Sequence, residues 1–431
     1  MPIQQNPPAE KQRAWSVALR LLFVGAVVLF LRGSASWPQT PPAAHDSRWQ
    51  DDLSVFANRF PSSQKDFDKL YPRDQFNEEL TAIRRDATQL SSAEIKLRLM
   101  RLVASAHVAH TTVEEPLSFR RLPLVFYWFS DGLAVTSAAQ EYSEALGAHV
   151  LRIGLMTPEQ LEAAVAPYIS YENDPWLHQN SPNYVRLAEL LHHLKLDDLD
   201  GRVDVTLAKS GGEPFTLAVA PVLGSLTVVS AADALHIPAP LYRKEPLRYY
   251  WYEYLQESKT LYIQYNKCDN DPRFSFEDFV NSVFAATHDK LIERTIVDLR
   301  FNEGGNDRVI LPLERAFKDR PALLGHGHLY VLIGRETFSS GMDAALDFRN
   351  RFHAVLVGEP LGEKPNSYAE VKDFKLPNSG LVIRYSTRFE RLLKDSDPPS
   401  LEPDILVTRS LADFLAGRDP VLDAAIRHPL Q

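Results

Sequence analysis

The sequence predicts an α/β fold in which a core of alternating strands and helices follows a helical region and a β-rich region. From residue 249 to 431, apolar strand-like runs alternate with helix-like segments, as expected of an α/β core. From residue 49 to 115, apolar residues recur every three or four positions, which is the period of one helix face. From residue 116 to 225, short strand-like runs dominate. The chain of 431 residues has room for two or three domains.

Three amphipathic stretches predict the helices of the N-terminal region. Ser91 and Glu94 have the spacing of a capping box at the start of the third helix. The apolar stripes are Trp49, Leu53, Phe56 and Phe60; Phe76, Leu80, Ile83, Ala87 and Leu90; and Ile95, Leu99, Leu102 and Val103. We interpret these stripes as core contacts rather than as a binding face.

Short apolar runs predict the strands of the β-rich region. Thr157, Pro158 and Gln160 predict a helix start there, because proline favours the first helical position. Residues 171–200 do not fit a compact β domain and read as an inserted lobe. The three prolines between residues 236 and 248 indicate a linker over 226–248.

The core region contains strand-like and helix-like segments in alternation. The expected strands cover residues 249–254, 261–265, 295–299, 329–333 and 353–358. We expect helices over residues 275–291 and after Ser339.

The N-terminus has the features of an export signal or a membrane anchor. Lys11 and Arg13 precede an apolar run over residues 21–31, and small residues follow it. These 11 apolar residues are short for a membrane span of ~20, but they suit the core of a signal peptide. We therefore expect residues 1–36 to be a signal peptide or an uncleaved anchor, with neither as the third alternative, and residues 37–48 to be a linker. Either of the first two makes the protein exported, periplasmic or extracellular.

Composition excludes several classes of function. A formal charge of −9 without a basic patch argues against a nucleic-acid partner. Cys268 is the only cysteine, so no intramolecular disulfide can form, and we expect it to be buried or half-buried. The sequence has no zinc-protease, P-loop, dinucleotide-binding or lipase-type nucleophile motif. We expect neither a cofactor nor a metal.

A serine lies where a buried strand turns into a helix. The apolar run 329–333 leads to the segment TFSSG at residues 337–341, after which helical spacing resumes. A helix N-terminus offers unpaired N–H groups that can hold the oxyanion of an acyl-transfer transition state. Serine, threonine and glycine are also ordinary helix caps, so this turn alone does not decide between a nucleophile and a cap.

A second turn carries two adjacent glycines. The strand-like run from residue 295 ends in a polar turn with Gly304 and Gly305. Paired glycines let the backbone approach a ligand closely and point N–H groups at it. The simpler interpretation is a turn that ends a strand.

Together these segments resemble the carboxyl-terminal processing (tail-specific) serine peptidases and their tricorn-like relatives. The matching motifs are DLRFNEGG at residues 298–305, TFSSG at 337–341 and VGEPLGEK at 357–364. The resemblance covers roughly residues 116–431. It implies a ClpP/crotonase-like spiral core of ββα units over 249–431, a helical N-terminal domain over 49–115, and a PDZ-like domain over 116–225 with an insertion at 171–200.

The resemblance also implies a set of catalytic roles. Ser339 is the expected nucleophile, with Ser340 as its rival. The oxyanion donors would be the N–H of Gly304 or Gly305 and that of Ser340. The base would be either His110, supported by Glu402 or its rival Asp404, or Lys364 at the end of the Gly-rich loop.

Two departures from the family pattern leave the base open. Relatives have Gly-Asp-Gly before the His-Thr pair, whereas this chain has His107, Val108 and Ala109, and Leu361 replaces a loop threonine. A histidine needs little tuning to act near neutral pH, while a lysine must be desolvated. A degenerate site without a working base is the third alternative.

These observations predict an exported serine endopeptidase of the tail-specific type, which cleaves extended polypeptides through an acyl-enzyme on Ser339. The alternatives are a non-catalytic peptide-binding protein on the same fold, and an esterase or other acyl-transfer enzyme. The expected partner is a polypeptide substrate. The sequence does not indicate the oligomeric state.

Overall fold

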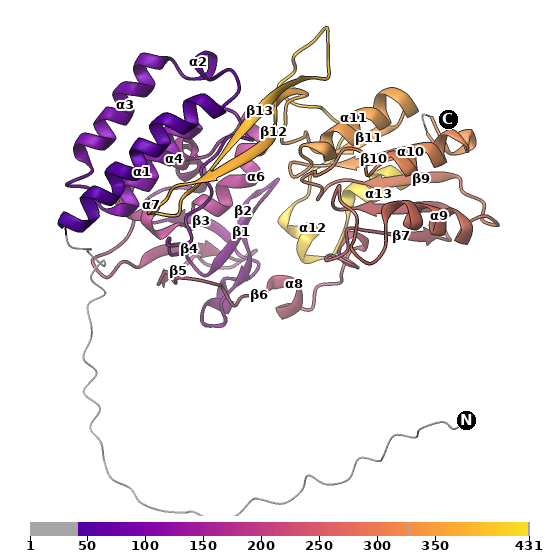
Figure 1. Ribbon diagram of the computed structural model, residues 1–431. Coiled ribbons are helices and arrows are strands. Elements are labelled where there is room, and N and C mark those ends of the chain that lie inside the picture. The colour runs from indigo at the N-terminus through magenta and orange to yellow at the C-terminus, as the bar shows by residue number, and fades with distance from the viewer. Residues whose placement is uncertain (1–41, 326, 430–431) are drawn as a thin grey trace, which may run out of the picture. The chain divides into compact units, whose positions relative to one another are not determined.

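The computed structural model describes residues 42–325 and 327–429, all within one compact unit (Figure 1). The predicted signal peptide or anchor lies outside the described residues, as do the first five residues of the predicted linker. Within the described ranges, no helix is both long enough and apolar enough to cross a membrane.

Four helices form the N-terminal region, and three of them carry the predicted apolar stripes. The four are α1 (Pro42–Ser63), α2 (Phe67–Leu70), α3 (Arg73–Asp86) and α4 (Ser92–Ala104). The short α2 was not predicted. The predicted capping box of Ser91 and Glu94 is present at the start of α4. The predicted linker 37–48 is wrong from residue 42 onward, because α1 begins at Pro42, a residue that suits the first helical position.

An antiparallel sheet follows, with strand order β1-β2-β3-β4-β5, and β6 pairs with β2. Its strands are β1 (Leu124–Phe129), β2 (Gly132–Ala138), β3 (His149–Ile153), β4 (Val203–Ala208), β5 (Phe215–Val219) and β6 (Val229–Ser230). The 3₁₀ turn η1 (Gln140–Ala145) joins β2 and β3. The connection from β3 to β4 is helical, with α5 (Pro158–Val165), η2 (Ala166–Tyr168), α6 (Asp174–Tyr184) and α7 (Ala188–His193). The predicted insertion 171–200 therefore consists mainly of α6 and α7. The predicted linker 226–248 carries β6, α8 (Ala231–Ala234) and η3 (Leu241–Arg243).

The helical region and the antiparallel sheet share one apolar core. Phe56 of α1, Leu99 of α4 and Val135 of β2 belong to the same buried cluster. Core packing therefore continues across the predicted domain boundary at residues 115 and 116.

The C-terminal region contains the predicted α/β core. Its sheet has the order β14-β11-β10-β9-β8-β7, in which β7 is antiparallel and every other pairing is parallel. The strands are β7 (Tyr250–Leu255), β8 (Thr260–Tyr265), β9 (Arg294–Asp298), β10 (Leu329–Ile333), β11 (Val355–Gly358) and β14 (Ile405–Leu406). One apolar cluster joins one face of the sheet to the helices α9 (Phe276–Ala286), α10 (Leu311–Lys318) and α11 (Ser340–Phe352). A second cluster joins the other face to α13 (Pro420–Arg427).

Two short helices complete this region, η4 (Pro321–Leu323) and α12 (Leu411–Leu415). The predicted α/β class is confirmed. The helix expected over 275–291 ends earlier, at Ala286, because Thr287 leaves the helical conformation. Since β9 and β10 are parallel neighbours, their carboxyl ends meet at one edge of the sheet.

A long hairpin that the sequence did not predict links the C-terminal region to the N-terminal helices (Figure 1). It consists of β12 (Asn366–Lys375) and β13 (Val382–Arg391), which pair only with each other in regular register. Thr112 and Arg384 exchange backbone hydrogen bonds, and Ser386 accepts one from Lys65. Phe374 and Ile383 reach the core of the helical region. The hairpin thus connects the segment after His110 to the loop that ends at Lys364.

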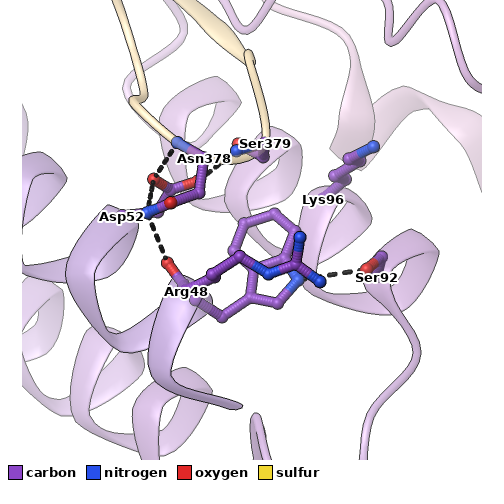
Figure 2. Close-up of a pocket in the computed structure, with 7 residues that line it drawn as sticks. Arg48, Asp52, Ser92, Lys96, Asn378 and Ser379 are labelled. Atoms are coloured by element: carbon purple, nitrogen blue, oxygen red, sulfur yellow. Dashed lines mark hydrogen bonds between the residues drawn. The ribbon is translucent and has the colours of Figure 1, made fainter. Parts of the chain in front are cut away.

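A buried carboxylate holds the tip of this hairpin (Figure 2). Asp52 of α1 is fully buried and accepts hydrogen bonds from the backbone N–H groups of Asn378 (2.8 Å) and Ser379 (2.7 Å). The side-chain amide of Asn378 donates to Asp52 and to the carbonyl of Arg48. These bonds fix the turn between β12 and β13 against the first helix.

Candidate active site

The glycine turn after β9 and the serine turn before α11 touch each other. Gly304 has φ +100°, and a methyl group on its Cα would lie 2.7 Å from Ser339 Cβ and 2.8 Å from Ser340 N. Only glycine fits such a contact, because the backbone angle is one that other residues rarely adopt and because no room is left for a side chain. The two sequence motifs therefore form one site, as their order along the chain predicts.

Asn302 holds the two turns together. Its carbonyl accepts a hydrogen bond from Phe338 N (3.0 Å), and its side-chain oxygen accepts one from Gly304 N (2.9 Å). Thr337 adds a second link, since its hydroxyl donates to the carbonyl of Leu299 (2.8 Å). Both side chains are fully buried. We assigned no role to Asn302 or Thr337 from the sequence, although both lie inside the quoted motifs.

Ser339 has an unusual backbone conformation, with φ +52° and ψ −131°. It occupies the N-cap position of α11, yet its side chain makes no capping hydrogen bond. The neighbouring Ser340 is buried and donates its hydroxyl to the carbonyl of Gly305 (3.0 Å). Of the two serines, Ser339 therefore has the hydroxyl that is free to react.

Two backbone N–H groups beside Ser339 are available as oxyanion donors. Within the described ranges, the N–H groups of Gly305 and Ser340 have no hydrogen-bond acceptor, whereas that of Gly304 is used by Asn302. Between the two glycines, the geometry therefore favours Gly305 as the partner of Ser340. Gly304 instead allows the glycine turn to approach Ser339 closely.

His110 lies beside the nucleophile turn. Its buried ring packs on Phe338, with ring centroids 4.5 Å apart. Burial lowers the pKa of His110 to about 4, so the imidazole is neutral near pH 7 and can accept a proton. Among the described residues, no hydrogen bond joins the ring to Ser339 Oγ. Such bonds often form only when substrate binds.

Glu363 is the acid that the structure adds to this site. Its Oε1 lies 3.5 Å from His110 Nδ1 and accepts a hydrogen bond from Ser367 (2.8 Å), and its Oε2 accepts one from Ser339 N. Burial, together with the nearby charge of Glu172, raises the pKa of Glu363. Glu363 was not among the residues predicted from the sequence. Its only sequence signal was its place in the loop motif, directly before Lys364.

The structure places Lys364 and Glu402 away from Ser339. The Lys364 ammonium pairs with Asp397 (3.3 Å), and its side chain keeps 27% of its exposure. Glu402 is exposed, and its carbonyl binds Arg349, about two turns along α11 from Ser340. Its rival Asp404 also pairs with Arg349. The structure thus places Glu363, rather than Glu402, beside His110.

The segment 171–200 forms one wall of the site. Trp176 stacks on Phe338, with centroids 4.1 Å apart and an angle of 16°, so that Phe338 contacts both Trp176 and His110. The side-chain amide of Asn173 donates to the carbonyls of Leu361 (3.0 Å) and Pro399 (2.9 Å). This segment therefore contacts the nucleophile turn and the loop that carries Glu363.

This arrangement, with a serine turn against a glycine turn on a parallel sheet, defines an acyl-transfer class of site. No family model matches the sequence, and no curated protein matches it. The structure does match solved structures of CPAF. A serine-to-alanine mutant of CPAF superposes with a TM-score of 0.61 at 12% identity, over 89% of this chain and 97% of that chain.

Mature CPAF complexed with lactacystin superposes with a TM-score of 0.59, also at 12% identity, over 89% of this chain and 98% of that chain. The tricorn protease matches at 13% identity over 88% of this chain and 36% of that chain, but its TM-score of 0.42 is too low to carry an argument. At this level of identity the likeness shows the fold. The fold class expected from the motif resemblance is therefore confirmed for nearly the whole described chain.

Proposed function

We propose that this protein is a serine endopeptidase of the tail-specific type, with Ser339 as nucleophile, His110 as general base and Glu363 as the acid that supports the base. The observation that carries the proposal is the contact between the two turns. It sets a serine with an uncommitted hydroxyl against two free N–H groups and a buried imidazole. No cofactor is needed for this chemistry.

The reaction follows from these positions. Ser339 Oγ attacks the peptide carbonyl carbon while His110 takes the hydroxyl proton. The N–H groups of Gly305 and Ser340 then stabilise the oxyanion of the tetrahedral intermediate. His110 gives its proton to the leaving amine, and water hydrolyses the acyl-enzyme through the same base.

Glu363 acts on the imidazolium that forms during this transfer. Its Oε1 faces Nδ1 of His110, so an ionised carboxylate would stabilise the protonated ring. Lys364 is the weaker candidate for the base. Its ammonium is paired with Asp397 and partly solvated, and within the part of the chain that the structure describes no hydrogen bond joins it to Ser339.

The decisive experiment compares Ser339→Ala, His110→Ala and Lys364→Ala in fluorophosphonate labelling and in hydrolysis of unfolded casein. We expect Ser339→Ala to abolish both and His110→Ala to slow both by about 10²- to 10⁴-fold. Lys364→Ala should stay within a few fold of the parent. Labelling of Ser340, or full activity of His110→Ala, would overturn this assignment.

A non-catalytic peptide-binding protein is the second candidate. It is favoured by the missing hydrogen bond between His110 and Ser339 Oγ in this substrate-free structure. If the folded protein binds unfolded polypeptide but Ser339 never labels between pH 5 and 9, the peptidase proposal fails and the binding function stands.

We also propose that the protein acts outside the cytoplasm, on extended polypeptides. Support comes from the charged and apolar pattern of the first 36 residues. Cell fractionation with N-terminal sequencing tests this proposal. A mature N-terminus near residue 36 indicates a cleaved signal, an intact N-terminus in the membrane fraction indicates an anchor, and cytoplasmic protein contradicts export.

A further inference from the structure

A second glutamate, half-buried as a residue but with a buried carboxyl oxygen, lies near the base and the acid of the proposed site. Glu172 begins the segment 171–200, and its Oε1 accepts a hydrogen bond from Ala109 N (3.2 Å), the residue before His110. Its Oε2 is buried and, among the described residues, has no hydrogen-bond partner. Glu172 and its neighbour Asn173, which donates to the carbonyl of Leu361, therefore connect the segment before His110 to the loop that carries Glu363.

Its neighbours hold this carboxyl group in place. Asn173 donates to the carbonyls of Leu361 and Pro399, and its side-chain oxygen caps α6 by accepting from Trp176 N (2.9 Å). Trp176 in turn stacks on Phe338. Hydrogen bonds and a ring contact thus fix the backbone on the C-terminal side of Glu172, so its position does not depend on a flexible loop.

We propose that Glu172 is a positioning residue that forms a buried carboxyl pair with Glu363 and thereby sets the pH at which the pair of His110 and Glu363 becomes reactive. The proposal rests on the proposed function, in which His110 must be neutral and Glu363 ionised before attack. It gives the inserted segment a direct part in the chemistry.

The charges around this pair support the proposal. Burial raises the pKa of Glu172 to about 7, while Lys364 lowers it and Asp397 raises it to smaller degrees. Burial also raises the pKa of Glu363, and the charge of Glu172 is the next cause, with Asp343 adding a smaller effect. The groups that face the pair are therefore His110, Lys364, Asp343 and Asp397.

The Glu172 charge shifts the pH of the reactive form in the same direction whichever member of the pair, His110 or Glu363, holds the proton. Just below the reactive pH, His110 and Glu363 share one titratable proton, and its loss leaves a carboxylate beside a neutral imidazole. A negative Glu172 opposes that loss, because the product has one more negative charge. Removing this charge must therefore lower the pH at which the reactive form appears.

Glu172→Gln tests this directly, because glutamine keeps an oxygen that can accept from Ala109 N. We expect the midpoint of the pH dependence of Ser339 labelling by a fluorophosphonate to fall by about one unit. Glu172→Asp, which keeps the charge, should restore a midpoint closer to the parent. Glu189→Gln is the matched control, since Glu189 is a buried acid of α7 in the same segment and pairs with Arg120 instead.

A measurement without catalysis separates this inference from the proposed function. In protein carrying ¹⁵N-labelled histidine, the NMR titration of His110 should shift to lower pH in Glu172→Gln and stay unchanged in Glu189→Gln. If the parent never labels but His110 shifts as expected, the proposed function fails and the carboxyl pair stands. If folded Glu172→Gln leaves both the labelling midpoint and the His110 titration within about 0.2 units of the parent, the inference is overturned.

Discussion

At the residue scale, Ser339 is held in a conformation that a serine rarely adopts. A positive φ in a residue with a side chain costs about 1–3 kcal/mol and persists only where the surroundings impose it. Here Phe338 N donates to Asn302, Met342 N donates to the carbonyl of Ser339, and Ser339 N donates to Glu363. These bonds hold the strained angle, and the Ser339 hydroxyl makes no capping hydrogen bond to the helix that follows.

Replacing Gly304 tests the fit between the two turns. In Gly304→Ala, the new methyl would overlap Ser339 Cβ and Ser340 N, so the serine turn must move. Since one misplaced oxyanion donor already costs about 10²–10³ in kcat, we expect at least that loss in labelling and hydrolysis. Gly201→Ala is the control, because Gly201 has a similar angle (φ +73°) with nothing within 4 Å. Equal activity of the two variants would contradict the assigned contact.

The sequence could supply residues within a motif but not their distant partners. Ser339, Gly304 and His110 were predicted because short motifs of a known pattern surround them. Glu363 and Glu172 were not assigned, because their roles depend on contacts with residues 24 and 63 positions away or more. No local pattern encodes such a contact.

At the element scale, the hairpin β12–β13 connects parts of the chain that are far apart in sequence. At its base, Ser367 donates a hydrogen bond to Glu363. Its middle pairs with the segment after His110, and Asp52 holds its tip. The helices were predictable because one apolar stripe repeats at 3.6 residues. The hairpin was not, because most of the second half of β12 is exposed and breaks the alternation that identifies a strand.

Removing the Asp52 carboxylate should release the hairpin tip. Asp52→Ala leaves the backbone N–H groups of Asn378 and Ser379 without their acceptor, at a cost of about 3 kcal/mol in the free energy of unfolding. Urea unfolding measures this loss, and hydrogen exchange at the two amides should become faster. Asp51→Ala removes an exposed neighbouring carboxylate and should have little effect. An Asp52→Ala protein as stable as Asp51→Ala would show that the bonds contribute nothing.

At the scale of the whole molecule, several half-buried carboxyl groups have raised pKa values. Burial raises the pKa of Asp343 to about 6 and, with the charge of Glu303, that of Glu336 to about 7. A carboxyl group whose pKa is higher in the folded state binds more protons there than in the unfolded chain. Each such group therefore lowers stability as the pH rises from its unfolded pKa to its folded pKa.

Glu336→Gln isolates one of these contributions. Because Glu336 penalises the folded state increasingly from about pH 4.3 to about 7, the variant should gain stability relative to the parent over this range. The difference in Tm between variant and parent should therefore be larger at pH 8 than at pH 5. The exposed Glu257→Gln controls for the loss of a surface charge. A Tm difference that shrinks with rising pH would contradict the raised pKa.

The proposed base precedes the nucleophile by 229 residues (339 − 110), and its supporting acid follows the nucleophile. The proposed site therefore cannot form while the chain is only partly synthesised. His110 needs Ser339, and both need the loop that carries Glu363 and the hairpin that follows it. The site can form only after the hairpin β12–β13, which ends at Arg391, has been synthesised.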